Sequence, residues 1–229
     1  MPTSTVEDYL KCIYLESQRA PVELVSTGRI AAAMKVAPGT VTAMMKTLTE
    51  SGLVAYEPYA GVRLTEAGRR LATHVLRRHR LVELFLVRIM GMDWSEVHDQ
   101  AEVLEHAVSE RLIERIDEML GHPAVDPHGD PIPTAGGEIE EPELATLLSC
   151  EIGATMVVAR VTDQRSEFLQ LLERHGLMPG RSVRVDSRDE LAETVLVRPE
   201  SGRSLQLGFR AASRIGVRTA SRTGVSVPG

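Results

Sequence analysis

Imidazole and carboxylate side chains recur at helical spacing between His79 and His106, in two helical segments that meet at Gly91. A helix has 3.6 residues per turn, so side chains three or four apart share one face. Stacked groups of this kind can hold a divalent transition metal, or they can form a solvated acidic face. Their number on two adjacent helices favours a metal site. The six residues are His79, Glu83, His98, Glu102, Glu105 and His106.

The N-terminal part has the pattern of a winged helix-turn-helix. Apolar residues predict a helix over 4–18, a short helix capped by Ser26 or Thr27, and a third helix from about Thr40 to Ser51. Two strand-like segments, 53–57 and 62–65, flank a turn and predict a wing. We expect residues 1–72 to form a DNA-binding domain, with a winged helix used for protein contacts as the alternative.

If this domain binds DNA, its third helix enters the major groove. That helix offers no arginine for a bidentate contact to guanine, so DNA shape and phosphate contacts should carry much of the recognition. The net charge of −6 requires any basic footprint to be local. The candidate DNA contacts are Gly39, Thr40, Thr42, Ala43, Lys46, Arg29 and Arg63.

The remaining chain divides into a helical and a β part. Helices are expected over 66–90, 94–107 and 109–120, with an apolar face that includes Leu104 and Leu112. This predicts a helical metal-binding and dimerisation domain over 73–140, in a twofold homodimer. Residues 141–152 read as a linker, 153–220 as a small SH3-like β-barrel, and 221–229 as a disordered tail. The expected fold class is mainly α with small β parts.

Location is predicted from features that the sequence lacks. The two cysteines form no Cys-x-x-Cys pattern, which fits a reducing compartment. No signal peptide and no apolar run of membrane-spanning length are apparent. The sequence therefore predicts a cytoplasmic protein with no membrane partner.

Three segments resemble the diphtheria-toxin-repressor family of metal-dependent transcriptional repressors. They are RRHRLVE at 77–83, EVHDQAEVLEHAVS at 96–109 and DPHGDPIP at 126–133. The resemblance implies a winged helix, a dimerisation domain and an SH3-like domain. It also implies a primary metal site of Asp8, Glu102, Glu105 and His106, which His79 joins in some manganese-type members. An ancillary site is implied at His79, Glu83 and His98, completed by Gln164 and Glu167.

The resemblance is closer to the manganese-sensing branch. Asp8 and Glu102 stand where the iron branch has Met and Cys. Carboxylates are harder ligands than sulfur and favour Mn²⁺ over later metals. Lys11 stands where some manganese-type members have a ligand Glu, and it could neutralise spare carboxylate charge or be solvated.

The expected function is a Mn(II)-dependent repressor of metal-uptake genes. It would bind palindromic, double-stranded operator DNA as a homodimer when the metal is bound. Fe(II) or another divalent transition metal could substitute in vitro, and an iron(II)-dependent repressor of the same family is an alternative. A di-metal carboxylate helical enzyme and a metal-independent winged-helix repressor are further alternatives.

Overall fold

The computed structural model describes residues 3–19 and 23–220, so the predicted tail at 221–229 lies outside the described residues. The chain forms two compact units. The first contains the residues up to Val82, with 102–122 and 132–140. The second contains 83–101, 123–131 and the residues from Glu141 onward.

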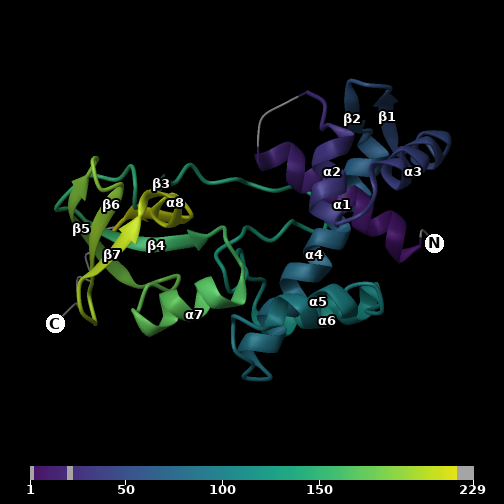
Figure 1. The fold of residues 1–229 in the computed structure, drawn as a ribbon. Helices are drawn as coiled ribbons and strands as arrows, with labels where there is room; N and C mark the ends of the chain where they lie inside the picture. Colours follow the sequence, from purple (N-terminus) through teal and green to yellow (C-terminus); the bar gives the residue numbers. More distant parts are fainter. Residues whose placement is uncertain (1–2, 20–22, 221–229) are drawn as a thin grey trace. The chain divides into compact units, whose positions relative to one another are not determined.

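The winged helix predicted for the N-terminal part is present in the first unit. Its helices are α1 (Ser4–Arg19), α2 (Thr27–Met34) and α3 (Pro38–Glu50), and its wing is the antiparallel pair β1 (Val54–Glu57) and β2 (Gly61–Leu64) (Figure 1). Ser26 caps α2 by accepting a hydrogen bond from the Arg29 amide. The third helix begins two residues before the predicted start, because Pro38 fits the first turn of a helix.

An aliphatic core with two tyrosines holds the winged helix together. Burying side chains of this size contributes about 1.5–3 kcal/mol each. They come from all three helices and the wing, so the core fixes α3 against α1. The fully buried members include Leu10, Ile13, Ile30, Val41, Met45, Leu48 and Val62.

The middle of the chain forms three further helices: α4 (Glu66–Arg88), α5 (Val97–Leu104) and α6 (Glu110–Leu120). The helix predicted over 94–107 is wrong at both ends. The amides of Ala107 and Val108 both bond to the Leu104 carbonyl, which closes a tight turn after α5. Ser109 then caps α6 through the Leu112 amide. Glu105 and His106 therefore lie in a turn and not on the helical stripe expected for them.

The predicted apolar face of α5 and α6 is only partly buried within the chain. Ile113 and Ile116 are buried, but Leu104, Leu112 and Met119 are exposed. Residues of the first unit at the end of α5 and along α6 thus present apolar side chains to their surroundings, which matters for the assembly proposed below.

The second unit contains a six-stranded antiparallel sheet, ordered β3-β8-β4-β5-β6-β7 (Figure 1). The strands are β3 (Ala145–Thr146), β4 (Thr155–Val161), β5 (Ser182–Asp189), β6 (Thr194–Pro199), β7 (Leu205–Gly208) and β8 (Ile215–Thr219). Helix α7 (Ser166–Arg174) packs Leu169 and Leu172 into the same core, and α8 (Phe209–Ala212) contributes Ala212. Register shifts in the β4–β8 and β5–β6 pairs bend the sheet.

The segment expected to be a linker belongs in part to this sheet. Strand β3 lies within 141–152 and pairs with β8, Ala145 opposite Val217. The β domain therefore begins by Ala145. The short pairing is preceded by an acidic, Pro- and Gly-rich stretch, which masked it in the sequence. In the part of the chain that the structure describes, no helix is long and apolar enough to cross a bilayer.

We predict that Gly68→Ala destabilises the first unit. An ideal Cβ at Gly68 would lie 1.9 Å from the Leu53 carbonyl oxygen, which is backbone and cannot move aside cheaply. Overpacking of this kind costs about 1–3 kcal/mol. Urea unfolding followed by circular dichroism measures the loss. Gly28→Ala is the matched control, because its Cβ would meet nothing within 4 Å. Equal stabilities of the two variants would contradict the close approach.

Candidate metal centre and DNA-binding surface

The predicted primary site residues come together in the first unit, and we call them the primary group. Asp8 comes from α1, His79 from α4 and Glu102 from α5, while Glu105 and His106 lie in the turn after α5. One ligand atom from each of Asp8, Glu105 and His106 lies within 4.8 Å of the others, and the same holds for His79, Glu102 and Glu105. Two overlapping sets of three donors thus share Glu105.

Glu105 is the centre of the primary group and is 0% exposed. Its Oε2 lies 2.6 Å from His79 Nδ1, and its Oε1 lies 2.5 Å from Lys11 Nζ. His106 Nε2 lies 2.8 Å from Asp8 Oδ1. The first helix of the winged domain is therefore joined to the turn after α5 through polar contacts that a metal ion could replace.

Burial and charge act in opposite directions on the residues of α1. Desolvation raises the pKa of Asp8, although the neighbouring His106 opposes the rise. For Lys11, burial lowers the pKa, but Glu105 and Glu102 outweigh burial and leave that pKa raised. A nearby cation would thus stabilise the ionised form of Asp8, and the side chain of Lys11 remains a charged ammonium.

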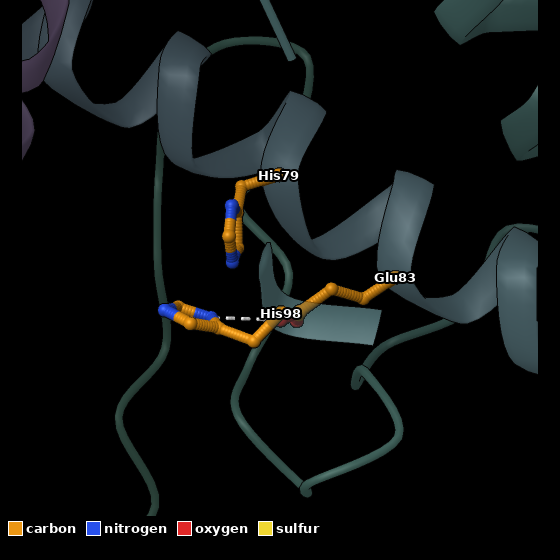
Figure 2. A group of neighbouring side chains, drawn as sticks. All are labelled: His79, Glu83 and His98. Carbon is orange, nitrogen blue, oxygen red and sulfur yellow. Dashed lines mark hydrogen bonds and ion pairs between the residues drawn. The ribbon is translucent and has the colours of Figure 1, made fainter. Parts of the chain in front are cut away.

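The predicted ancillary residues lie along α4 and α5. His79 and Glu83 are one turn apart on α4, and Figure 2 shows both with His98. Glu83 is fully buried, and its Oε1 lies 3.2 Å from Nδ1 of the half-buried His98. The second unit thus brings together a carboxylate and an imidazole of the predicted ancillary set.

A second set of donors around Glu83 was missed by sequence reasoning. Glu83, Asp126 and His128 lie in the second unit, all are buried, and one ligand atom of each lies within 4.8 Å of the others. Asp126 Oδ1 accepts hydrogen bonds from the amides of His128 and Asp130, which shapes the loop. We call these three residues the buried group. The DPHGD segment, with two acids around a histidine, was the available signal.

His128 is tied to its surroundings by several contacts. Its ring stacks on Trp94 with 5.6 Å between centroids, and its Nε2 lies 2.9 Å from the Trp94 carbonyl oxygen. Burial lowers the pKa of His128, but the Glu83 carboxylate, 3.8 Å away, and the charge of Asp126 outweigh burial and raise it to about 9. A metal ion bound at Nδ1 of His128 would replace the proton on that nitrogen.

The two residues expected from the SH3-like domain join neither group. The Gln164 amide donates to Asp130 Oδ2 at 2.8 Å, and Glu167 is exposed in the first turn of α7. Among the described residues, Glu167 belongs to no set of His, Cys, Asp and Glu donors that could hold a metal.

The predicted DNA contacts differ in their exposure and in whether their polar groups are already bonded within the protein. Gly39, Thr40, Ala43 and Lys46 are exposed on α3, and Arg63 is exposed on the wing. The hydroxyl of half-buried Thr42 donates to the Pro38 carbonyl oxygen at 3.1 Å. The Arg29 guanidinium is held by Glu16, with Nε at 3.1 Å and Nη2 at 2.9 Å from Oε2, and so fastens α2 to α1.

Comparison with known proteins places this arrangement in a family. Residues 1–62 match the model for the iron dependent repressor N-terminal DNA binding domain. Residues 65–134 match the iron dependent repressor metal binding and dimerisation domain, and 145–219 match the FeoA domain. The chain belongs to the diphtheria-toxin-repressor family of metal-dependent transcriptional repressors. The enzyme alternative is therefore discarded, and the predicted fold class, with its SH3-like C-terminal domain, is confirmed.

Individual relatives include both iron- and manganese-dependent proteins. The iron-dependent repressor IdeR of Mycobacterium bovis is 31% identical over 205 residues, 84% of this chain and 88% of the relative. The regulator MntR of Lysinibacillus sphaericus is 37% identical over 120 residues, 52% of this chain and 84% of the relative. A solved structure of a manganese-dependent transcriptional repressor complex with manganese has a TM-score of 0.85 and 42% identity, covering 94% of this chain and 100% of that one.

The buried group can be tested through Trp94, which is the only tryptophan of the chain. We expect Mn²⁺ to quench Trp94 emission, because a paramagnetic ion at His128 would lie beside the indole ring. His128→Ala should abolish the quenching, whereas His106→Ala in the primary group should keep it. Quenching that survives His128→Ala would exclude this residue as a ligand.

Proposed function

We propose that this chain is a manganese-dependent transcriptional repressor. It binds palindromic operator DNA as a homodimer when Mn(II) is bound, and it controls metal-uptake genes. The cytoplasm, where such a repressor meets DNA, is its proposed location. The observation that carries the proposal is the Asp8–His106 contact of 2.8 Å, which connects the DNA-binding domain to a set of metal donors.

The chemistry of the donors fits Mn²⁺. Asp8, Glu102 and Glu105 offer carboxylate oxygens, and His79 and His106 offer imidazole nitrogens. No sulfur ligand belongs to the donor sets found among the described residues. Oxygen-rich sets suit harder divalent ions, whereas thiolates and thioethers select softer ones. The manganese-dependent relative at 42% identity supports the same choice.

Metal would act by fixing the winged helix. An ion bound by Asp8 and by the turn after α5 holds α1 in place, and α1 shares its core with the recognition helix α3. Because binding is reciprocal, DNA that selects this arrangement also tightens metal binding. The proposed DNA contacts are the exposed α3 residues and Arg63, with Thr42 and Arg29 in supporting positions.

The homodimer is supported by the exposed apolar residues of α5 and α6. Val103, Leu104, Leu112 and Met119 are between 38% and 73% exposed in the single chain. A second copy that covers these side chains would remove them from water, and a twofold pair would match a palindromic operator.

Metal-dependent DNA binding tests the proposal. Duplexes selected from a random pool in the presence of Mn²⁺ should bind the chain, and chelation should release them. Asp8→Asn and Glu105→Gln should weaken binding at a fixed Mn²⁺ concentration within the range of about 5–150-fold that is usual for coupled sites. Asp99→Asn, an exposed residue of α5, is the matched control. Binding that chelation leaves unchanged would reject the proposal.

Metal preference tests the manganese assignment separately from DNA binding. Asp8→Met combined with Glu102→Cys replaces two hard oxygen donors with sulfur donors, so we expect activation to shift from Mn²⁺ toward Fe²⁺. Anaerobic gel shifts with each metal measure the preference of the wild type and of the double variant. If the order of the two metals does not change, Asp8 and Glu102 do not determine selectivity.

A further inference from the structure

Lys11 places a cation inside the primary group. The residue is 6% exposed, and its Nζ lies 2.8 Å from Glu102 Oε1 and 2.5 Å from Glu105 Oε1. Both partners are candidate metal ligands. The ammonium therefore links α1 to α5 and to the turn that follows it, which is the connection that a metal ion would also make.

The charges around Lys11 explain why it lies there. Asp8, Glu102 and the fully buried Glu105 come close together in this group, and like charges at short range repel strongly in a protein interior. A buried charge is tolerated only when it is paired and hydrogen-bonded. Lys11 supplies one such partner to two of the three carboxylates.

The oxygens of Glu105 are already engaged. Oε1 accepts from Lys11, and Oε2 lies 2.6 Å from His79 Nδ1. A metal ion that takes Glu102 and Glu105 as ligands meets the ammonium at the same two carboxylates. The ion must therefore displace Lys11 or hold its positive charge close to another one.

We propose that Lys11 is an internal competitor of the metal for Glu102 and Glu105, and that it sets the metal affinity of the primary group. The inference rests on the proposed metal-dependent function and identifies the residue that sets its threshold. Lys11 pairs the carboxylates when little metal is present and raises the free metal concentration at which the ion replaces it. Release of Lys11 is then part of the response to metal.

The test is Mn²⁺ binding by the chain, measured by equilibrium dialysis in a His98→Gln/His128→Gln background that removes donors of the ancillary set and of the buried group. Lys11→Met and Lys11→Gln keep much of the side-chain length and remove the charge. If the Lys11-bonded arrangement is about 90% populated, its removal should tighten Mn²⁺ binding by about tenfold. Unchanged or weaker binding in both variants would overturn the proposal.

Arg78→Met is the charge-matched control. Arg78 pairs with Glu7 at 2.9 Å and with Glu110 at 3.5 Å. Glu7 bonds His106, so the variant removes a cation near the group that does not pair with Glu102 or Glu105. A direct competitor requires Lys11→Met to tighten binding clearly more than Arg78→Met does. Equal effects of the two variants on Mn²⁺ binding would show that Lys11 acts only through the general electrostatic field. That result would overturn the proposed competition.

Thermal melting separates competition from a merely structural ion pair. Without added metal, Lys11→Met should lower the melting temperature, because the carboxylates lose their partner. With saturating Mn²⁺ the difference should shrink, since the ion then pairs them. A difference that Mn²⁺ leaves unchanged would contradict the proposal.

Glu105→Gln tests the underlying metal-dependent function separately. If this variant leaves Mn²⁺ binding intact, the proposed metal site itself is wrong. If it weakens Mn²⁺ binding and Lys11→Met has no effect, only the proposed competition fails.

Discussion

The buried carboxylate of Glu105 is the constraint on which the organisation of the first unit depends. A fully buried charge costs several kcal/mol unless other groups pair with it. Glu105 obtains its partners from far along the chain: Lys11 from α1 and His79 from α4. The need to pair one side chain thus brings the first helix of the DNA-binding domain to the turn after α5. A metal ion at the same place would use a connection that the protein already has to make.

Glu83 imposes the same requirement in the second unit. It is also fully buried, and its oxygens face His98 at 3.2 Å and His128 at 3.8 Å. The loop that carries His128 is held by the Asp126 carboxylate, which bonds two of its amides, and Gly129 adopts φ +87° within it. An ideal Cβ on Gly129 would lie 1.9 Å from the Ala159 carbonyl oxygen, so only glycine lets the loop pack here. The DPHGD segment is therefore a structural element as well as a set of donors.

Much of this organisation was predictable because it follows local patterns. Helical periodicity identified α1 to α4 and α6, and strand alternation with turn residues identified the wing and most of the β domain. The sequence predicts Glu105 and His106 as metal ligands but not their conformation, because the turn after α5 depends on two hydrogen bonds to the Leu104 carbonyl and on the Ser109 cap. For Lys11 the sequence leaves two alternatives, neutralisation of carboxylate charge or solvation, and it could not decide between them for another reason. Its partners lie more than ninety residues away, and only the folded chain brings them together.

The presence of the Lys11 ammonium among the carboxylate ligands has a further consequence for metal selectivity. Lys11 offers a single charge on a flexible stem, and it bonds oxygens without demanding a coordination geometry. Under the proposed competition, a divalent ion must outcompete it for the same carboxylates, so weakly bound ions are rejected whatever their size. Among ions that bind strongly enough, the carboxylate and imidazole donors then favour harder metals over softer ones. Affinity and metal preference would therefore depend on different residues of one group, Lys11 for the former and the choice of Asp8 and Glu102 for the latter.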